Sequence, residues 1–332
     1  MRIGIVKLSA LGDIVHAMVA LQFIKAQISD VEIDWIVEER FAQLLQYNPD
    51  IDKVLAVNLK ALKTDKTAIF RQLGQVRRYA RNRYDLVIDA QGLIKSALTA
   101  KLLGAPTAGF DVHSIRERFA SWFYDIKINC SYDTNTIDRN ACVLSRPLGF
   151  EITPAQILAK KPFLFFNDRI CDFEPFLSRS HKNILFVTSS TWESRNYPLE
   201  KYAEAAEALQ QNGLLIWGND KERQQVQALA QRSAYLKVLP KLDLNALKAL
   251  IARMDLVIGN DTGPTHMAWA LNRPSITLFG PTPVSRVYQT PINKVIKSDS
   301  TVNPFKLNKL DFSIREIAAP DVIRLALEIL DS

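Results

Sequence analysis

The strongest chemical signal in the chain is a polar turn between a short apolar run and the start of a helix. Residues 256–258 are apolar, and directly after them comes the turn Gly259-Asn260-Asp261-Thr262-Gly263. Such a turn is expected at the carboxyl end of a buried parallel strand, where open α/β sheets bind ligands. The N–H groups of the next helix, with the hydroxyls of Thr262 and Thr265, suit a nucleotide pyrophosphate without a metal. The alternative is an ordinary capped turn between a strand and a helix.

The amino terminus has the same layout of strand, turn and helix. Residues 1–8 are mainly apolar, Gly12 lies in the turn, and from Asp13 apolar residues recur at helical spacing as far as Ile28. Asp13 is therefore expected at a helix start at the carboxyl end of a strand, where its simplest role is that of a cap. The single Gly12 does not make the dinucleotide-binding fingerprint, and there is no P-loop sequence, which argues against dehydrogenases and P-loop enzymes.

Parallel strands are needed to hold these two turns in place. The chain has 332 residues, of which 48% are hydrophobic and 23% charged, and this length predicts two globular domains rather than one core. Strand-like runs at 31–37, 85–89, 183–187 and 213–217 alternate with helical stretches, which is typical of βαβ units and parallel sheets. Prolines and polar residues interrupt the periodicity between residues 160 and 180, so we expect the domain boundary there.

Three segments of the chain resemble the signature sequences of the lipopolysaccharide heptosyltransferases. They are residues 7–16 (KLSALGDIVH), 89–96 (DAQGLIKS) and 260–266 (NDTGPTH). The resemblance extends from Met1 to the last helix, and within the family the chain looks most like the heptosyltransferase I branch. Enzymes of that branch transfer the first heptose from ADP-L-glycero-D-manno-heptose to the Kdo of lipid A.

The resemblance implies the GT-B architecture, in which two Rossmann-like domains with parallel sheets face each other across a cleft. Residues 1–165 would form the acceptor-binding domain, and residues 180–312 would form the domain that binds the ADP-sugar. The last helix, within residues 313–332, would pack back on the first domain.

The resemblance also implies the residues of an inverting displacement. A Kdo hydroxyl must lose its proton as it attacks the anomeric carbon, and the family's proposed base falls on Asp13. Hydroxyls and a fixed cation would hold the departing diphosphate, so neither a metal nor another cofactor is expected. The implied donor-binding residues are Ser189, Ser190, Thr191, Arg195, Glu222, Asp261, Thr262, Gly263 and His266. Without the resemblance, Glu222 is simply a surface carboxylate and His266 a hydrogen-bonded histidine at a helix start.

Positive charge is concentrated in residues 53–83. This stretch contains nine basic residues and one acid, so it carries more charge than the net +7 of the whole chain. Within it an apolar helical stripe is expected to face the core and to leave the arginines in solvent. The stripe consists of Ile69, Leu73, Val76 and Ala80.

Lys60 and Lys63 precede this helix in an expected loop, where ligand contact is favoured. Together with Arg116 they are the expected acceptor-binding residues, and in the family the anionic partner is phosphorylated lipid A with its Kdo carboxylates. A nucleic acid would also explain the charge, but no nucleic-acid motif and no interleaved aromatic residues accompany it. Residues 114–124 pair basic with aromatic side chains, which could rest on an anionic membrane or form a partly buried helix.

Cysteine usage and hydropathy indicate the compartment. Cys130, Cys142 and Cys171 are odd in number and lack C-x-x-C spacing, which argues against a disulfide scaffold and a zinc site. No apolar run approaches ~20 residues, and the first residues do not have the pattern of a signal peptide. We therefore expect a cytoplasmic protein in peripheral contact with the cytoplasmic face of the inner membrane.

Other functions stay open at this point. The chain could transfer heptose to a later core position, or bind a sugar nucleotide without catalysis, because a fold alone does not determine a function. A sugar-nucleotide epimerase of the same architecture would need no basic surface for a lipid. Asp13 together with the Asp261-Thr262-Gly263 turn favours an active transferase.

Overall fold

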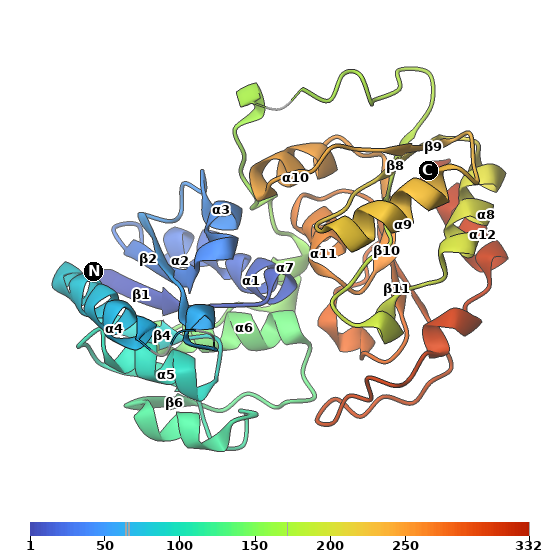
Figure 1. Cartoon of the computed structure of the whole chain (residues 1–332). Coiled ribbons are helices and arrows are strands. Elements are labelled where there is room, and N and C mark those ends of the chain that lie inside the picture. The colour runs from blue at the N-terminus through green and yellow to red at the C-terminus, as the bar shows by residue number, and fades with distance from the viewer. Residues whose placement is uncertain (64, 66, 171, 332) are drawn as a thin grey trace. The chain divides into compact units, whose positions relative to one another are not determined.

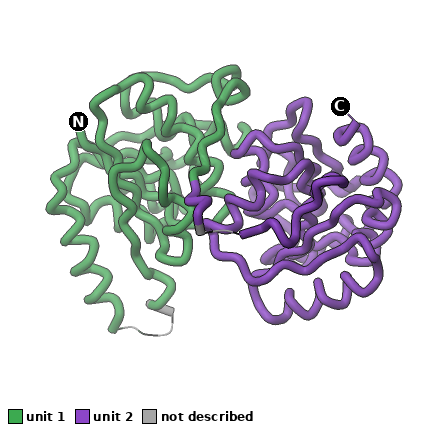
Figure 2. Tube along the Cα trace, turned by 90° about the horizontal axis from the view of Figure 1, so that it is seen from above, with its two compact units in different colours: residues 1–165 green, residues 166–332 purple. Residues whose placement is uncertain are grey.

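Two compact units make up the chain. The computed structural model describes residues 1–63, 65, 67–170 and 172–331, and it divides the chain between Phe165 and Phe166 (Figures 1 and 2). Each unit is built on its own six-stranded sheet, and the strand pairings in both sheets are parallel. The α/β class with two parallel sheets is therefore confirmed.

The first unit, residues 1–165, has its strands in the order β3-β2-β1-β4-β5-β6. The strands are β1 (Arg2–Val6), β2 (Glu32–Glu38), β3 (Lys53–Val57), β4 (Leu86–Asp89), β5 (Thr107–Phe110) and β6 (Ile126–Ile128). The helices are α1 (Leu11–Met18), α2 (Ala20–Gln27), α3 (Ala42–Leu45), α4 (Ala68–Tyr79), α5 (Ile94–Lys101), α6 (Thr136–Ser145) and α7 (Pro154–Leu158). Short 3-10 turns include η2 (Leu59–Lys63) and η4 (Arg118–Phe123).

The second unit, from residue 166, has its strands in the order β12-β11-β10-β7-β8-β9. The strands are β7 (Asn183–Val187), β8 (Asn212–Leu215), β9 (Leu236–Val238), β10 (Leu256–Asn260), β11 (Ser275–Phe279) and β12 (Asn293–Lys297). The helices are α8 (Leu199–Leu209), α9 (Asp220–Ala230), α10 (Leu244–Ile251), α11 (Gly263–Ala270) and α12 (Ala319–Leu330). Short 3-10 turns include η7 (Glu193–Arg195) and η8 (Val284–Arg286).

Both sheets have the same strand order and therefore the same kind of ligand-binding edge. If the strands of each unit are numbered from 1 in chain order, both sheets have the spatial order 3-2-1-4-5-6. Strands 1 to 3 therefore extend the sheet in one direction, and strands 4 to 6 extend it in the other. Ligands of such doubly wound sheets bind at the carboxyl ends of the two strands where the direction reverses. These strands are β1 and β4 in the first unit, and β7 and β10 in the second. The three sequence motifs follow β1, β4 and β10.

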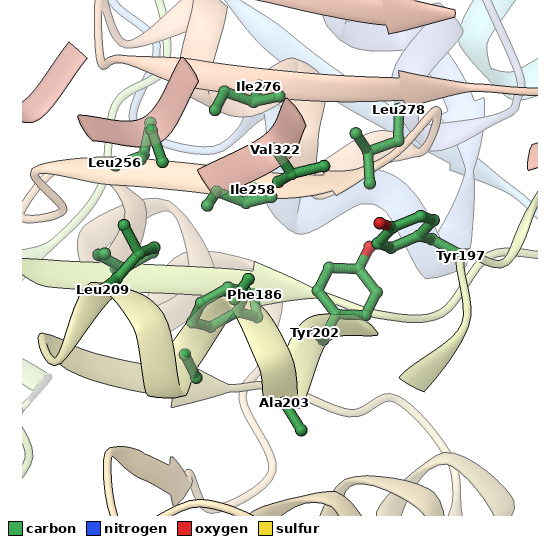
Figure 3. Close-up of a cluster of buried hydrophobic side chains, with 14 of the residues drawn as sticks. Phe186, Tyr197, Tyr202, Ala203, Leu209, Leu256, Ile258, Ile276, Leu278 and Val322 are labelled. Carbon is green, nitrogen blue, oxygen red and sulfur yellow. The ribbon is translucent and has the colours of Figure 1, made fainter. Parts of the chain in front are cut away.

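The core of the second unit includes the last helix. Phe186 of β7, Tyr202 of α8 and Ile258 of β10 belong to one buried cluster with Val322 and Ala326 of α12 (Figure 3). Helix α12 contacts α8, β10 and β11. Its apolar stripe completes the core of its own unit, because the outer faces of these strands need a helical cover. The expected packing of this helix against the first domain stays a prediction.

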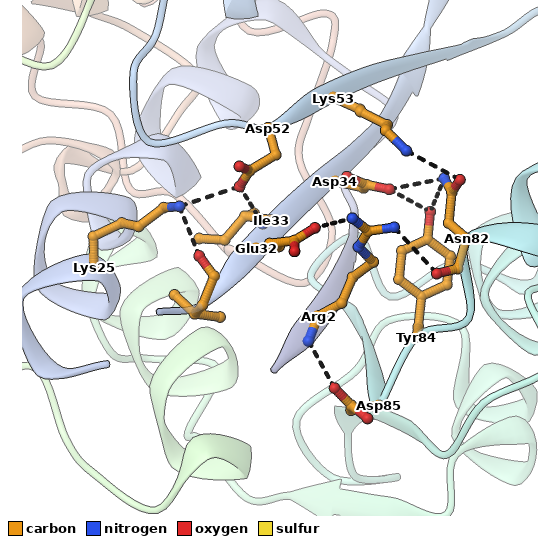
Figure 4. Close-up of polar contacts among 11 residues, drawn as sticks. Arg2, Lys25, Glu32, Ile33, Asp34, Asp52, Lys53, Asn82, Tyr84 and Asp85 are labelled. Carbon is orange, nitrogen blue, oxygen red and sulfur yellow. Dashed lines mark hydrogen bonds and ion pairs between the residues drawn. The ribbon is translucent and has the colours of Figure 1, made fainter. Parts of the chain in front are cut away.

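Polar contacts stabilise the amino-terminal edge of the first sheet (Figure 4). The backbone N–H of Arg2 donates to Asp85 at 2.7 Å, and the Arg2 guanidinium pairs with Glu32. The Tyr84 hydroxyl donates to the buried carboxylate of Asp34 at 2.9 Å. These contacts join β1, β2 and the start of β4 at one end, and the opposite ends of β1 and β4 carry the motifs.

Two local expectations differ from the structure. The helix expected from Asp13 to Ile28 is two successive helices, α1 and α2. On α4, Ile69 is exposed although it was expected to face the core, and Gln72 is buried. The polar Gln72 can be buried because its side-chain oxygen accepts the backbone N–H of Asn58 at 2.8 Å. The arginines of α4 are exposed, as the charge pattern indicated.

Candidate functional site

Asp13 lies in the first turn of α1, at the carboxyl end of β1. The helix begins at Leu11 with Ala10 in the cap position, and the Asp13 carboxylate accepts the backbone N–H of Ala10 at 3.2 Å. Asp13 is thus not the cap residue itself, because it follows three residues later and reaches back to the cap. Its side chain is half-buried, so this edge of the sheet presents a carboxylate that a substrate can reach.

Gln91 connects the loops of the two central strands in the first unit. Its side-chain oxygen accepts the backbone N–H groups of Leu8 and Ser9 at 3.1 and 3.0 Å. Gly92 has a φ of 71°, a backbone conformation that would be strained for a residue with a side chain. A Cβ at this position would also lie 3.1 Å from the side chain of Ile115. This part of the second motif therefore shapes the turn that faces the loop after β1.

Asp89 and Lys7 also belong to the motifs, and the structure gives both a structural role. The buried Asp89 carboxylate accepts hydrogen bonds from the backbone N–H groups of Gln91 and Gly92 and from the hydroxyls of Ser96 and Tyr124. Burial raises the pKa of Asp89 despite these hydrogen bonds. The Lys7 ammonium donates to the carbonyl of Ala90 at 2.7 Å and to the side chain of Asn140 at 3.0 Å. Both polar groups hold the carboxyl ends of β1 and β4.

Cationic side chains lie near a buried carboxylate at the end of β2. Glu38 is 4% exposed, and burial raises its pKa while Lys95, Lys60 and Arg40 oppose the rise. Lys60, expected to bind the acceptor, is exposed on η2, and its backbone N–H donates to Glu38. Lys95 is exposed on the first turn of α5. Lys95 belongs to the second motif, but the sequence analysis did not identify it as a candidate site residue. Only the order of the strands places Lys95 and Lys60 around the same carboxylate, that of Glu38.

Arg116, another expected acceptor-binding residue, follows a different strand from Lys60. Arg116 is exposed in the loop after β5, whereas the Lys63 side chain lies outside the described residues. Strands β3 and β5 are four strand spacings apart, which is about 19 Å, and β1 lies between them. Lys60 and Arg116 therefore follow strands on either side of the one that leads to Asp13.

Asp261 is the centre of a buried charge cluster at the carboxyl end of β10. One of its oxygens lies 3.0 Å from Nε2 of His266, and the other lies 3.3 Å from Nη1 of Arg195 and 3.4 Å from Nε of Arg286. Burial by itself would raise the pKa of Asp261, but Arg286, the hydrogen bond from His266, and Arg195 hold this pKa well below its usual range. Two guanidinium groups thus face one carboxylate, and the cluster has net positive charge for an anionic ligand.

Both guanidinium groups reach Asp261 from loops of neighbouring strands. Arg195 ends η7 after β7, donates to the Thr191 hydroxyl at 2.9 Å, and stacks on the ring of Trp192. Arg286 ends η8 after β11, and its side chain is 24% exposed. The sequence analysis missed Arg286 because it lies far from Asp261 along the chain. The available signal was the second polar turn, Gly280-Pro281-Thr282-Pro283, which ends shortly before it.

The start of α11 supplies backbone N–H groups at the turn that follows β10, as the polar turn at residues 259–263 predicts. Thr262 is the cap residue, and the helix begins at Gly263. The Thr265 hydroxyl, expected to face the ligand, is buried and donates instead to the carbonyl of Asn260 at 2.8 Å. It fits there because Gly259 has no side chain, and a Cβ at that residue would lie 2.8 Å from this hydroxyl.

Asn260 holds the loop after β7 against the end of β10. Its buried amide donates to the carbonyl of Thr188 at 2.9 Å, and its oxygen accepts the N–H of Tyr197 at 3.0 Å and the hydroxyl of Tyr202 at 3.1 Å. A side-chain amide therefore bridges the two central strands in each unit, Gln91 in the first and Asn260 in the second.

The three hydroxyl residues expected to bind phosphate differ in availability. Ser190 donates to the carbonyl of Trp192 or to the side chain of Asn196, both at 2.8 Å, so its hydroxyl shapes the loop. Ser189 is half-buried, and Thr191, which accepts from Arg195, is exposed. Ser189 and Thr191 are therefore the better candidates for phosphate contact.

Two further hydroxyls mark the same edge of the second sheet. Thr188 follows β7 and Thr282 follows β11, so they lie after the two strands that flank β10. Both hydroxyl oxygens are buried and have no hydrogen-bond partner within the described residues. Buried hydroxyls without partners are uncommon, and a bound ligand is one way to satisfy them.

Glu222 lies in the first turn of α9, after β8. Its carboxylate accepts the backbone N–H of Gly218 and the side-chain amide of Asn219, both at 2.7 Å, and Asn219 caps the helix. Glu222 thus takes part in the helix cap. A carboxylate accepts several hydrogen bonds, so this role leaves room for a ribose hydroxyl.

The described residues contain no group of three or more His, Cys, Asp or Glu side chains that could hold a metal ion. The Asp-x-Asp sequence at residues 50–52 directly precedes β3, at the opposite edge of the first sheet from the motifs. There Asp52 accepts the backbone N–H of Ile33 at 2.7 Å and pairs with Lys25. This carboxylate thus belongs to the packing of the amino-terminal edge.

None of the helices in the described part of the chain is long and apolar enough to cross a membrane. Cys130 is buried, Cys142 is half-buried, and neither forms a disulfide. Cys171 lies outside the described residues.

The sequence matches the family model for glycosyltransferase family 9 (heptosyltransferase) over residues 71–305, more than half of the chain. The chain belongs to this family. Lipopolysaccharide heptosyltransferase 1 of Campylobacter coli is 36% identical to it, and the match covers 99% of each sequence. The protein of that name from Escherichia coli K12 is 31% identical, over 85% of this chain and 88% of its own length.

A solved structure shows the same family likeness. Escherichia coli heptosyltransferase WaaC with ADP-2-deoxy-2-fluoro heptose superposes with a TM-score of 0.78 at 26% identity, and the match covers 99% of both chains. The protein is therefore a glycosyltransferase with a GT-B type fold, and the family resemblance of the three motifs is confirmed.

Proposed function

We propose that this glycosyltransferase moves L-glycero-D-manno-heptose from ADP-heptose to the Kdo of Kdo-lipid A, with inversion and without a metal ion. The observation that carries the proposal is the cluster of Arg195, Arg286 and His266 around Asp261, beside the start of α11. Positive charge and helix N–H groups at one point suit a diphosphate. The names of the relatives and the ADP-heptose analogue bound to WaaC support heptose as the transferred sugar.

On the donor side, the cluster stabilises the leaving group. As the bond between the anomeric carbon and the diphosphate oxygen breaks, negative charge grows on the diphosphate, and Arg195 and Arg286 neutralise it. The carboxylate of Asp261 would repel a phosphate, so it positions the cations rather than binding the donor. Contacts to ADP-heptose come from Ser189, Thr191, Arg195, Arg286, the backbone N–H groups of Thr262 and Gly263, His266 and, at the ribose, Glu222.

On the acceptor side, Asp13 is the base. It takes the proton of a Kdo hydroxyl, whose oxygen then attacks the anomeric carbon from the face opposite to the departing ADP, and the configuration inverts. Lys60, Lys63 and Arg116 bind the carboxylates and phosphates of the acceptor. The span of about 19 Å between the ends of β3 and β5 exceeds one sugar, which favours an acceptor with several anionic groups.

A lipid-linked acceptor requires access to a membrane. We infer that the protein works in the cytoplasm, in peripheral contact with the cytoplasmic face of the inner membrane. The exposed basic and aromatic side chains within residues 114–124 support this, because a basic residue near an anionic leaflet contributes about 1 kcal/mol to binding.

The test is incubation with ADP-heptose and Kdo-lipid A, followed by mass and linkage analysis. We expect one added heptose on Kdo. The matched control is Asp13→Asn, which should transfer heptose about 10²–10⁴-fold more slowly. Product only with a longer core acceptor would assign a later heptosyl position. A change in the donor without acceptor would indicate an epimerase, and donor binding without any product would indicate a non-catalytic binding protein.

A further inference from the structure

Exposed apolar side chains gather on one face of the first unit. Phe119 is 61% exposed and Trp122 is 74% exposed, and their rings pack edge to face with centroids 5.0 Å apart. Both lie on η4, which packs beside α5 (Figure 1). Ile94 and Leu98 are exposed one turn apart on α5. These four residues, which we call the aromatic patch, form the kind of surface that marks an interaction site.

The exposure of the two aromatic rings follows from how η4 is held. Ala120, Ser121 and Tyr124 are buried, and the Tyr124 hydroxyl donates to Asp89 at 2.6 Å. The Ser121 hydroxyl donates to the carbonyl of Arg118 at 2.8 Å. Because Ala120 and Ser121 face the interior, the side chains of Phe119 and Trp122 on either side of them point outward.

Positive charge borders the aromatic patch. Lys95, Arg116 and Arg118 are exposed next to its members. The acid in this segment is Glu117. Its carboxylate accepts the backbone N–H of Ile94 at 2.8 Å and so stabilises the amino-terminal end of α5. The surface is therefore apolar in its centre and cationic at its border.

We propose that the aromatic patch docks on an anionic lipid bilayer. Phe119 and Trp122 enter the boundary between headgroups and acyl chains, and Arg118 and Lys95 bind the headgroup phosphates. A second copy of the chain fits this face less well, because a symmetric contact would bring the two cationic borders together.

One end of the aromatic patch lies near the edge of the sheet that carries Asp13. The start of α5 and the loop after β5 both lie at the carboxyl edge of the first sheet. That edge also carries Asp13, whereas η4 ends at the opposite edge, where the carbonyl of Phe123 accepts the hydroxyl of Thr107 at the start of β5 at 2.8 Å. A bilayer on this flank of the unit therefore reaches the edge of Asp13 at the Ile94 end of the patch. In this respect the inference rests on the proposed function, and it names the surface that the proposed membrane contact uses.

The experiment is co-sedimentation of the full chain with vesicles of phosphatidylethanolamine and phosphatidylglycerol, and with neutral phosphatidylcholine vesicles. We expect F119S/W122S to bind the anionic vesicles at least tenfold more weakly than the wild type. The matched control is L158S, because Leu158 is 53% exposed on α7 of the same unit, and it should bind within twofold of wild type. R118Q should weaken binding about fivefold, and neutral vesicles should bind poorly.

Three results would overturn the docking surface. The first is that F119S/W122S binds vesicles as strongly as the wild type. The second is that sedimentation velocity without lipid shows a dimer of the wild type that this variant does not form. The third is that this variant no longer transfers heptose to a deacylated, soluble acceptor. The last result would place the patch within the acceptor site. If the wild type binds vesicles through the patch but transfers no heptose to any acceptor, the proposed function fails and the docking surface stands.

Discussion

At the scale of single residues, the two units use their carboxylates in opposite ways. Asp13 is half-buried at the edge of its sheet, where a base must be reachable. Asp261 is buried among Arg195, Arg286 and His266, and its charge holds these side chains in place. A reachable base and a cationic leaving-group site are the two requirements of an inverting transfer from a nucleotide diphosphate.

The first prediction concerns the base. Asp13→Asn should keep the fold and the affinity for ADP, because the amide oxygen can still accept the N–H of Ala10. The turnover number should fall by about 10²–10⁴-fold, since the amide cannot take the proton. Initial rates and calorimetry with ADP measure both effects. A variant that turns over as fast as the wild type would show that Asp13 only stabilises the start of α1.

The second prediction concerns Arg286. Its replacement by Gln should lower kcat/KM about 10- to 150-fold, which corresponds to the loss of one charge-assisted contact of about 1.5–3 kcal/mol, and should weaken ADP binding. Asp261 keeps Arg195 and His266 as partners, so the fold should persist. The control is Arg324→Gln, because Arg324 is an exposed arginine paired with Glu328. Unchanged kinetics in Arg286→Gln would limit this arginine to neutralising Asp261.

At the scale of elements, one side-chain amide in each unit joins the loops of the two central strands. Gln91 binds the loop after β1, and Asn260 binds the loop after β7. Loops have few backbone partners of their own, so such an amide determines where the ligand-binding groups lie. Both residues belong to the recognised motifs, and their role there is structural.

The third prediction tests this role at Asn260. Asn260→Ala would leave the carbonyl of Thr188, the N–H of Tyr197 and the hydroxyl of Tyr202 without this partner. The Tyr202 hydroxyl keeps the carbonyl of Val187 as an acceptor at 3.3 Å, which leaves two groups. Unsatisfied buried groups cost about 1–3 kcal/mol each, so the free energy of unfolding should fall by about 2–6 kcal/mol, with weaker ADP binding. Denaturant unfolding followed by fluorescence measures the change. Asn129→Ala, which removes an exposed amide paired with Asp111, should change it by less than about 1 kcal/mol; equal effects of the two substitutions would refute the bridging role.

At the scale of the whole molecule, two sheets of the same order carry different chemistry at equivalent edges. The first edge has Asp13 with basic residues on either side, and the second has the cluster around Asp261. The fold supplies two equivalent sites, and the side chains in the loops give them different ligands.

The fourth prediction separates the two units. Replacing Lys60, Lys63 and Arg116 by Ala should raise KM for the acceptor and leave ADP binding nearly unchanged, because these residues lie in the first unit. Glu222→Ala should weaken ADP binding and spare the acceptor KM. The control is Arg77→Ala with Arg78→Ala, two solvated charges of α4 that should contribute little. If the triple variant has the same KM for the acceptor as the wild type, these three residues are solvated charges that do not bind the acceptor.

The fifth prediction concerns metal. With Arg195, Arg286 and the start of α11 to neutralise the diphosphate, transfer should continue in EDTA at the rate without chelator. Initial rates after extensive chelation measure this. Loss of activity that magnesium or manganese restores would show that a metal ion supplies part of the positive charge.

The sequence by itself determined the fold class and the edges of the sheets where the candidate site residues lie. Strand, turn and helix are contiguous in residues 1–18 and 256–270, and right-handed connections between parallel strands leave few topologies for such units. Asp13, Thr262 and Gly263 could therefore be placed at helix starts from the local pattern alone. The break in periodicity between residues 160 and 180 also includes the point where the two units separate.

Only the tertiary structure decided which side chains meet. Arg286 joins Arg195 at Asp261 because β11 and β7 both lie beside β10, and strand order is not a property of contiguous residues. The exposure of Trp122 depends on how its neighbours on η4 are buried against the sheet, and the burial of α12 depends on the free face beside α8. Local patterns specify elements, but contacts between elements depend on packing between residues far apart in the chain.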